Sequence, residues 1–349
     1  MRTLKVETGR PYDIIIKNGI IDNCGEFIKK VSKAMRVAVI SDTNVFPIYG
    51  DKVVNSLTNS GYQVYSFTFE AGEKSKNLTT ISKMYDFLAE NHITRTDLIV
   101  ALGGGVTGDM AGFAAASYLR GIDFVQIPTS LLAQVDSSVG GKTGVDIGAG
   151  KNLVGAFWQP VLVLIDSNTL DTLPPYYFED GMAEVIKYGC IKDKSLFDKL
   201  EKVNAADCID DIIYNCVAIK RDVVSRDERE KGERALLNFG HTLGHALEKI
   251  NNFTSLSHGQ AVAIGMCMIT KASEKAGLTE KGSAKRIENL CKKYNLPTYS
   301  EISKTEIARA ASSDKKTNGS SIKLALLKEI GESYLEKIEI SKLEDFISE

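Results

Sequence analysis

The sequence predicts an N-terminal α/β domain with a mostly parallel, Rossmann-like sheet, followed by an all-helical C-terminal domain. In the first half, β-branched runs such as RVAVISD (36–42) and TDLIVAL (96–102) alternate with stretches of helical periodicity, which is the pattern of βαβ units. After Pro174-Pro175 the chain has helical periodicity for most of its length. We therefore expect domains over 1–173 and 174–349, with the active site in the interdomain cleft.

The predicted first domain can be followed element by element. Alternating residues up to Ile16 indicate strands or a hairpin, and the segments 25–31, 47–58 and 78–91 have helical character. Strands are predicted at 36–42, 62–70, 96–102, 122–128 and 160–166. The glycine-rich stretch 136–152 fits neither element, so we expect an irregular but ordered loop there. In the second domain, only IKLALL (322–327) and SYLEKIEI (333–340) have strand character.

Composition narrows the class of protein. With 349 residues and a formal net charge of −2, the chain shows no sign of a nucleic-acid or membrane partner. The start MRTLKVETGRPYDIII lacks the apolar core of a signal peptide, and no apolar run nears the roughly 20 residues that cross a bilayer. Six cysteines stand at no paired spacing, which indicates reduced thiols. We expect a cytoplasmic protein.

A glycine run, GGGVTGD (103–109), matches the pattern G-x-G-x-x-G between a predicted strand and a predicted helix. Glycine lets the backbone approach a pyrophosphate closely, and the helix N-terminus offers N–H groups to it. The acidic residue expected about 20 positions later would be near Asp123, which begins a strand instead of ending one. Asp42, at a strand end, is the better candidate for a ribose contact. We therefore predict dinucleotide binding by a non-standard arrangement.

A second glycine motif, Gly140-Gly-Lys-Thr143, fails as a phosphate-binding P-loop. That motif requires glycine at the position that Asp136 occupies, so hydrolysis of a nucleoside triphosphate is disfavoured. The same region does concentrate polar residues in one segment, namely Asp136, Lys142, Asp146, Lys151 and Asn152.

Three of the four histidines, His241, His245 and His258, stand within one short stretch. His241 and His245 are four residues apart and share a helix face. Glu184, three residues before Lys187 in a predicted helix, is either a surface salt-bridge partner or an inward-facing ligand. A catalytic ion takes three protein ligands and keeps an open position. Any of the three histidines together with Glu184 would serve, and the residues alone do not choose among them.

Several long motifs together resemble the 3-dehydroquinate synthase family. They are GGGVTGD, SYLRGIDFVQIPTSLLAQVDSSVGGKTGVD, KNLVGAFWQP, GMAEVIKYG, LNFGHTLGHALE and HGQAVAIGM, and the resemblance extends from about Ser41 to Lys316. It implies a cytoplasmic homodimer that uses NAD and one divalent metal, Zn or Co. The implied substrate is a sugar-phosphate acid, 3-deoxy-arabino-heptulosonate 7-phosphate.

The implied reaction is a phosphate-eliminating lyase reaction of the shikimate pathway, which leads to the aromatic amino acids. NAD transiently oxidises the substrate, phosphate is eliminated, the ketone is reduced again, and ring opening with an intramolecular aldol step gives 3-dehydroquinate. NAD is therefore needed in catalytic amount, and its redox chemistry belongs to the cofactor.

The resemblance also implies residue roles. It places the metal on Glu184, His241 and His258, and it assigns His245 to the substrate instead. NAD contacts are implied for Asp42, Gly72, Glu73, Lys76, Gly104, Gly105, Gly108, Asp109, Thr129 and Ser130, with Lys142 and Lys151 nearby; many relatives have threonine where this chain has Ser130. Catalytic roles are implied for Asp136, Lys142, Lys187, Asn238 and His245. Substrate contacts are implied for Arg120 across a dimer interface, Lys151, Asn152, Lys220, Arg234, and Lys315 or Lys316.

Three alternatives remain open. A related sugar-phosphate cyclase of the inosose or valiolone type would act on a substrate without a carboxylate, so Arg234 with Lys315 or Lys316 favours the dehydroquinate product. A metal-dependent polyol dehydrogenase would release NADH at each turnover. A non-catalytic NAD-sensing or scaffold protein would need neither the predicted metal ligands nor the basic residues, and the presence of both sets disfavours it.

Overall fold

The structure is a computed structural model that describes residues 1–251, 255–313 and 320–348. The chain forms two compact units, Met1–Pro174 with Lys220–Glu228, and Pro175–Ile219 with Arg229–Glu349. The segment Lys220–Glu228 thus groups with the first unit although it lies far along the chain, an arrangement that a single boundary near Leu173 cannot describe.

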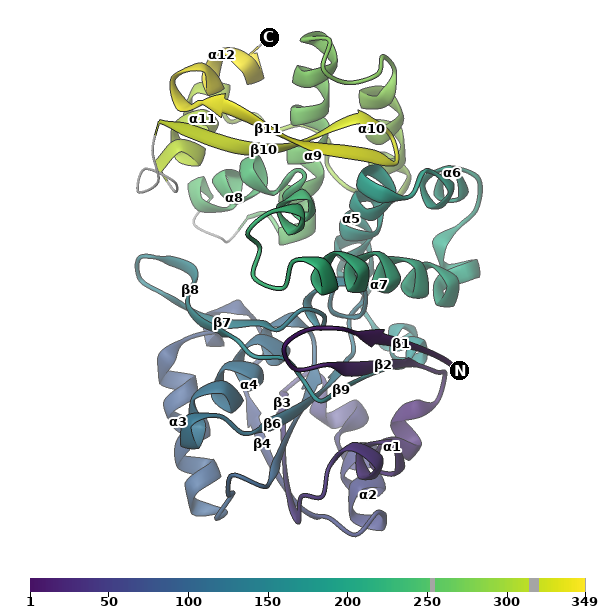
Figure 1. Ribbon diagram of the computed structural model, residues 1–349, viewed down its shortest axis with the longest axis vertical. Coiled ribbons are helices and arrows are strands. Elements are labelled where there is room, and N and C mark those ends of the chain that lie inside the picture. Colours follow the sequence, from purple (N-terminus) through teal and green to yellow (C-terminus); the bar gives the residue numbers. More distant parts are fainter. Residues whose placement is uncertain (252–254, 314–319, 349) are drawn as a thin grey trace. The chain divides into compact units, whose positions relative to one another are not determined.

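A seven-stranded sheet organises the first unit (Figure 1), in the order β1-β2-β9-β6-β5-β3-β4. Every neighbouring pair is parallel except β1 with β2, which form an antiparallel hairpin. The residues of β3, β5 and β9 are almost all buried, as expected for strands covered on both faces. The strands are β1 (Arg2–Val6), β2 (Tyr12–Ile16), β3 (Arg36–Asp42), β4 (Gln63–Phe69), β5 (Leu98–Gly103), β6 (Asp123–Pro128) and β9 (Leu162–Ile165).

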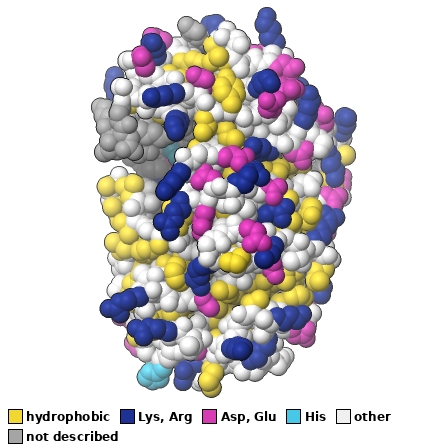
Figure 2. All heavy atoms as spheres, in the orientation of Figure 1, with side chains coloured by type: hydrophobic (Ala, Val, Ile, Leu, Met, Phe, Trp, Pro, Cys, Tyr) yellow, Lys and Arg dark blue, Asp and Glu magenta, His cyan; other side chains and the backbone are white. Residues whose placement is uncertain are grey.

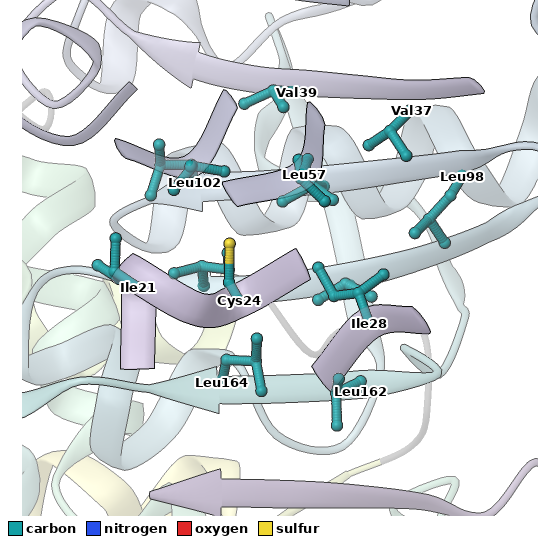
Figure 3. Packing of buried hydrophobic residues seen from close by; sticks show 14 of the residues in the cluster. Ile21, Cys24, Ile28, Val37, Val39, Leu57, Leu98, Leu102, Leu162 and Leu164 are labelled. Atoms are coloured by element: carbon teal, nitrogen blue, oxygen red, sulfur yellow. The ribbon is translucent and has the colours of Figure 1, made fainter. Parts of the chain in front are cut away.

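Helices cover both faces of this sheet. On one face, α1 (Cys24–Val31) and α2 (Asp51–Asn59) bury side chains against the strands. Figure 3 shows Ile28 and Leu57 from these helices among strand residues such as Val39 and Leu164. On the other face, α3 (Leu78–Glu90) and α4 (Gly105–Ser117) pack on β3 and β5. The predicted doubly wound α/β architecture is confirmed.

The strand order creates a switch point between β3 and β5. Strand β4 lies on one side of β3, and β5, β6 and β9 continue in sequence on the other side. In such sheets ligands bind beyond the carboxyl ends of the strands, where the winding direction reverses. Asp42 ends β3 and Gly103 ends β5, so the predicted ribose contact and the glycine turn lie at the position where this topology places a ligand.

The glycine-rich stretch from 136 to 152 differs from the prediction. It contains a short π-helix (Ala133–Ser137) and then an antiparallel hairpin of β7 (Lys142–Ile147) and β8 (Gly150–Phe157). Gly144 and Gly155 lie opposite each other, and a Cβ on Gly155 would stand 2.2 Å from the carbonyl oxygen of Thr143. The expectation of an irregular loop was wrong, because these glycines permit two backbones to approach closely in a strand pair.

Among its described residues, the second unit is helical apart from one hairpin, β10 (Ser321–Glu329) with β11 (Glu332–Glu339), at the position where the sequence shows strand character (Figure 1). Helix α9 packs on both α5 and α8. The helices are α5 (Pro175–Lys192), α6 (Lys194–Lys202), α7 (Ile209–Arg226), α8 (His241–Ile250), α9 (His258–Lys275), α10 (Ser283–Lys293), α11 (Lys304–Ser313) and α12 (Leu343–Ser348). The last two turns of α7, from Lys220 to Arg226, belong to the first unit.

The distribution of charged side chains on the surface is consistent with the small net charge. On the face shown in Figure 2, Lys and Arg side chains are interspersed with those of Asp and Glu. Within the part of the chain that the structure describes, we find no helix long and apolar enough to cross a membrane.

The covered sheet face allows a stability prediction. Leu57 of α2 is fully buried, so Leu57→Ala should lower the free energy of unfolding by about 2–5 kcal/mol through lost contacts and a residual cavity. Leu78→Ala, at a position that is 48% exposed at the start of α3, is the matched control and should change it by less than about 0.5 kcal/mol. Urea unfolding followed by circular dichroism measures both, and equal effects would contradict the packing described.

Candidate active site

A carboxylate and two imidazoles meet in the second unit. Glu184 belongs to α5, whereas His241 and His258 are the first residues of α8 and α9. Glu184 Oε1 lies 3.3 Å from His241 Nε2 and 3.7 Å from His258 Nε2. One potential ligand atom from each of the three lies within 4.8 Å of the others. The structure therefore brings together three residues from distant parts of the chain in an arrangement that can hold a metal ion.

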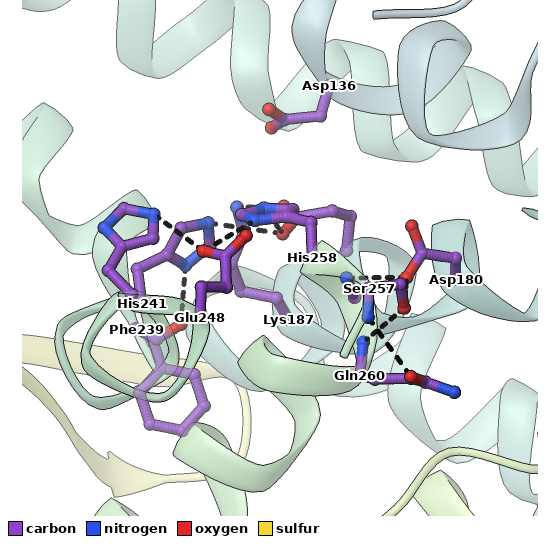
Figure 4. A network of polar contacts seen from close by, with 12 residues as sticks. Asp136, Asp180, Lys187, Phe239, His241, Glu248, Ser257, His258 and Gln260 are labelled. Atoms are coloured by element: carbon purple, nitrogen blue, oxygen red, sulfur yellow. Dashed lines mark hydrogen bonds and ion pairs between the residues drawn. The ribbon is translucent and has the colours of Figure 1, made fainter. Parts of the chain in front are cut away.

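The position of His258 depends on how α9 begins. Ser257 caps the helix in a capping box with Gln260. Asp180 of α5 accepts hydrogen bonds from the Ser257 hydroxyl and from the amide of Gly259, the latter at 2.7 Å (Figure 4). A Cβ on Gly259 would stand 2.1 Å from the carbonyl oxygen of Asp180. Glycine is thus required where α9 meets α5, one turn before Glu184, and this contact sets His258 beside the carboxylate.

The position of His241 depends on a second close approach. Gly240, just before α8, has φ +79°, and a Cβ there would stand 2.5 Å from Met266 Cγ. A Cβ on Gly265 of α9 would stand 2.0 Å from the carbonyl oxygen of Gly240. Because no side chain separates the two backbones, the start of α8 packs directly on α9, and the rings of His241 and His258 come within 5.2 Å, centroid to centroid.

The electrostatics of Glu184 match a bound cation. Its side chain is 1% exposed, and Lys187 donates a hydrogen bond to Oε2. Burial opposes ionisation, but Lys187 and His241 hold the pKa of Glu184 well below its usual range. Among the described residues, Oε1 has no hydrogen-bond partner. A buried carboxylate oxygen without a donor, facing two imidazole nitrogens, fits a divalent ion that accepts nitrogen and oxygen ligands.

His258 lies in a negative environment. Burial disfavours its charged form, but contacts with Glu184 and Glu248 outweigh burial and raise the pKa of His258 to about 10. The same surroundings that favour a proton on this ring favour a metal cation in its place.

His245 differs from the other two histidines. Its ring centroid is 5.5 Å from that of His241, yet its side chain is 52% exposed, and its Nε2 lies 4.0 Å from Glu248 Oε2. It lines a pocket of about 140 Å³ beside His241. Asn238, Thr242, Ala246, Lys249, Ala310 and Ala311 complete the lining. Geometry therefore distinguishes His245 from the other two histidines, because Glu184 faces the Nε2 atoms of His241 and His258.

Two other predicted residues lie nearby in the sequence. Arg234 is 1% exposed, in the short helix Glu233–Asn238. Asn238 lines the pocket and donates from Nδ2 to Glu230 Oε1 at 2.6 Å. Lys315 and Lys316 lie outside the described residues.

The glycine turn of the first unit contains glycines of two kinds. A Cβ on Gly103 or Gly108 would meet Thr107 Oγ1 at 2.4 Å or Gln126 Oε1 at 2.5 Å, so both are packed against side chains. A Cβ on Gly104, the residue just before α4, would meet Ser130 Oγ at 3.4 Å, which is an ordinary contact. Gly105 would meet Ser137 Oγ at 3.1 Å. Gly104 and Gly105 therefore leave the helix N-terminus beside hydroxyl groups, which suits a phosphate.

Asp42 is held by its surroundings at the end of β3. Its carboxylate accepts a hydrogen bond from Thr107 Oγ1 at 3.2 Å and from the amides of Asn44 and Val45 at 2.9 and 3.0 Å. A carboxylate has about four acceptor positions, so this one retains capacity for a hydroxyl group. Thr129 and Ser130 directly follow β6, and the Thr129 amide bonds to the carbonyl of Gly103 at 3.0 Å.

Charged residues gather around the same strand ends. Lys76 Nζ lies 2.7 Å from Asp109 Oδ2, and Lys151 Nζ lies 3.4 Å from Glu73 Oε1. Burial opposes the charge of Lys76, yet Asp109 and Glu73 raise the pKa of Lys76 above its ordinary value. Gly72, with φ +111°, turns the chain into this cluster.

Each of the remaining predicted site residues of the first unit has its own local environment. Asp136 Oδ2 lies 2.9 Å from Lys220 Nζ, and both residues belong to this unit. Lys142 is exposed at the start of β7, and the Asn152 amide donates to Asp146 at 2.8 Å. Leu119 and Arg120 adopt consecutive positive φ values of 50° and 68°. Such non-glycine conformations are uncommon, and they turn the chain sharply before β6.

Sequence reasoning missed two acidic residues of the second unit, the half-buried Asp180 and the buried Glu248. Asp180 anchors the first turn of α9, and Glu248, 2% exposed, faces His258 and His245. Their spacing was a usable signal, since Asp180 stands one helical turn before Glu184, and Glu248 two turns after His241.

The same fold occurs in solved structures of two synthases. A structure of 2-deoxy-scyllo-inosose synthase complexed with carbaglucose-6-phosphate, NAD⁺ and Co²⁺ has a TM-score of 0.88 at 24% identity and covers 99% of each chain. A structure of 2-epi-5-epi-valiolone synthase from Streptomyces hygroscopicus, with NAD⁺ and Zn²⁺ bound, has a TM-score of 0.87 at 24% identity and covers 100% of this chain and 98% of that chain. At this identity the comparison defines the fold class.

Sequence comparison defines the family. The family models for the N-terminal and C-terminal parts of 3-dehydroquinate synthase match residues 66–180 and 181–317. A 3-dehydroquinate synthase of Clostridium botulinum (strain Alaska E43 / Type E3) is 52% identical over 336 residues, which are 95% of this chain and 96% of the relative. The chain belongs to the 3-dehydroquinate synthase family.

The contact between α5 and α9 predicts a sensitive glycine. Gly259→Ala should lower the thermal unfolding temperature and cost about 1–3 kcal/mol, because the added methyl overlaps the Asp180 carbonyl. It should also weaken Co²⁺ binding, because His258 moves with the helix start. Gly148→Ala, where a Cβ meets nothing within 4 Å, is the control. A normal unfolding temperature and Co²⁺ affinity in Gly259→Ala would refute the required close approach.

Proposed function

We propose that this chain catalyses the 3-dehydroquinate synthase reaction, the conversion of 3-deoxy-arabino-heptulosonate 7-phosphate to 3-dehydroquinate and phosphate in the shikimate pathway. The observation that carries this conclusion is the identity of about one half with 3-dehydroquinate synthases over nearly the full length of both chains. The reaction class is a phosphate-eliminating carbon–oxygen lyase that depends on NAD and a metal.

We propose Glu184, His241 and His258 as the metal ligands and Zn or Co as the ion. The carboxylate oxygen without a donor and the two facing Nε2 atoms support this set. When bound, the ion would supply Lewis acidity that lowers the pKa of a coordinated hydroxyl group. Lys187 keeps the carboxylate ionised and fixes it through Oε2, so that Oε1 stays directed at the imidazoles.

We propose that NAD binds at the switch point of the first unit. Asp42, Gly104 and Gly105 lie there, and their geometry suits a ribose hydroxyl and a pyrophosphate. NAD supplies reversible hydride transfer when bound. Further proposed contacts come from the neighbouring charged cluster and strand ends, namely Gly72, Glu73, Lys76, Gly108, Asp109, Thr129, Ser130, Lys142 and Lys151.

The proposed substrate carries a carboxylate and a phosphate, and the proposed contacts other than Asp136 match these charges with cations and amides. Among them, His245 and Asn238 line the pocket beside His241, where they can hold a proton or donate to a substrate oxygen. The others are Asp136, Lys142, Lys151, Asn152, Lys187, Lys220, Arg234, and Lys315 or Lys316. We also propose a homodimer in which Arg120 contacts the substrate of the partner subunit.

The alternative functions occur on the same fold, so the backbone geometry does not distinguish them from the proposed reaction. An inosose- or valiolone-type cyclase acts on a substrate without a carboxylate, whereas the cations of Arg234 and of Lys315 or Lys316 would match an acidic substrate. A polyol dehydrogenase differs in its product, because it converts NAD to NADH at each turnover.

A product assay tests the proposed reaction. With 3-deoxy-arabino-heptulosonate 7-phosphate, NAD⁺ and Co²⁺ or Zn²⁺, the protein should release inorganic phosphate without a net absorbance rise from NADH, because the hydride is returned. Prior removal of metal with a chelator should abolish phosphate release, and adding the ion back should restore it. Stoichiometric accumulation of NADH would instead identify a dehydrogenase.

The ligand assignment is tested by a pair of histidine variants. His241→Ala should lower Co²⁺ affinity by more than about 100-fold, since even changes to groups that merely hold a ligand cost about 10- to 100-fold. His245→Ala should keep the Co²⁺ affinity and lower the rate of phosphate release. Equilibrium dialysis and the phosphate assay measure the two effects, and equal loss of metal in both variants would refute the assignment.

A further inference from the structure

We infer that Glu248 is a positioning residue of the metal site, whose carboxylate holds His258 through Nδ1 and thereby directs Nε2 toward Glu184. This inference deepens the proposed function and rests on the ligand set Glu184, His241 and His258. It assigns a role to a buried carboxylate that belongs neither to that ligand set nor to the proposed substrate contacts.

The imidazole of His258 lies between two carboxylates. Its Nε2 is 3.7 Å from Glu184 Oε1, and its Nδ1 is 3.6 Å from Glu248 Oε2 (Figure 4). The two ring nitrogens of an imidazole point in different directions, so a ring with an acceptor at Nδ1 presents Nε2 to the other side. Glu248 thus selects the tautomer with hydrogen on Nδ1, which leaves the Nε2 lone pair for a cation.

His241 shows the same arrangement with a different acceptor. Its Nε2 faces Glu184 Oε1 at 3.3 Å, while its Nδ1 lies 3.2 Å from the carbonyl oxygen of Phe239. Each proposed histidine ligand therefore has Nε2 toward the shared carboxylate and Nδ1 toward an oxygen acceptor. Acceptors of this kind orient metal-bound histidines and raise their basicity. For His241 the acceptor is neutral backbone, and for His258 it is a charged side chain.

The helix register explains why Glu248 can reach this position. It follows His241 by seven residues on α8, which is two turns, so both side chains emerge from one face. Glu248 is 2% exposed, and a carboxylate so deeply buried must be compensated by a cation or by hydrogen-bond donors. His258 and His245 are the imidazoles that face it, at 3.6 and 4.0 Å.

A second ion bound by His245, Glu248 and His258 is the competing explanation, because their ligand atoms also lie within 4.8 Å of one another. The two sets share His258, whose Nε2 already faces Glu184. A second ion would have to use the Nδ1 position and would stand one imidazole away from the first. His245 is the more exposed histidine and lies 4.0 Å from Glu248. Both observations favour a Glu248 carboxylate that positions His258 over a second metal site.

Metal affinity measured without substrate tests the inference. Glu248→Gln keeps the size and an acceptor oxygen but removes the charge, and it should weaken Co²⁺ binding by about 10- to 100-fold in competition with a chelator. The visible absorption spectrum of bound Co²⁺ should shift, because the ring of His258 changes orientation and basicity. Glu248→Asp retains the charge on a shorter side chain and should recover part of the affinity.

Two control variants show which results would contradict the role inferred for Glu248. Glu288→Gln removes a carboxylate that pairs with Lys292 on α10 and should leave Co²⁺ affinity unchanged. His245→Ala should also keep the parental affinity. Glu248→Gln with parental affinity and spectrum would overturn the inference, and so would His245→Ala with a loss equal to that of Glu248→Gln, since the latter supports the second set as ligands. Failure of the parent chain to bind Co²⁺ would instead refute the metal site of the proposed function.

Discussion

The buried carboxylate of Glu184 is the group on which the candidate metal site depends. Removing an isolated carboxylate from water costs several kcal/mol even after relaxation, so this one must be compensated inside the fold. Lys187 compensates one oxygen, and two imidazoles approach the other. A cation at that oxygen would complete the compensation. Glu184 is therefore the residue that most directly indicates a metal site.

Glycine residues allow the two imidazoles to come close to the buried carboxylate of Glu184. The imidazoles come from the first residues of α8 and α9. The start of α8 approaches the middle of α9, and the start of α9 approaches α5, at distances that exclude a Cβ. Gly240, Gly259 and Gly265 therefore act together, since each removes the side chain that would separate two backbones. The precision of the site comes from backbone contact more than from the side chains that surround it. Close packing of this kind also makes the ligand positions rigid.

Much of the fold could be predicted from the sequence, because alternation of β-branched strands with amphipathic helices is a local pattern. The hairpin β7–β8 was not predictable in the same way, because the reason for Gly144 and Gly155 is their contact with each other. The same limit applies to Asp180 and Glu248. In sequence they resemble surface acids, and only the packing of α5, α8 and α9 makes Asp180 a partner of Ser257 and Glu248 a buried partner of His258.

The three histidines show how burial divides residues that sequence treats as equal. Their side chains are 12%, 32% and 52% exposed for His241, His258 and His245. The least exposed ring has a neutral backbone acceptor at Nδ1, the intermediate one has a charged acceptor, and the most exposed one lines the pocket. A ring accessible to solvent can exchange protons with a bound molecule, whereas a ring fixed at both nitrogens can only hold its position. This gradient of exposure supports the proposed roles, in which His241 and His258 hold a cation and His245 acts on the substrate.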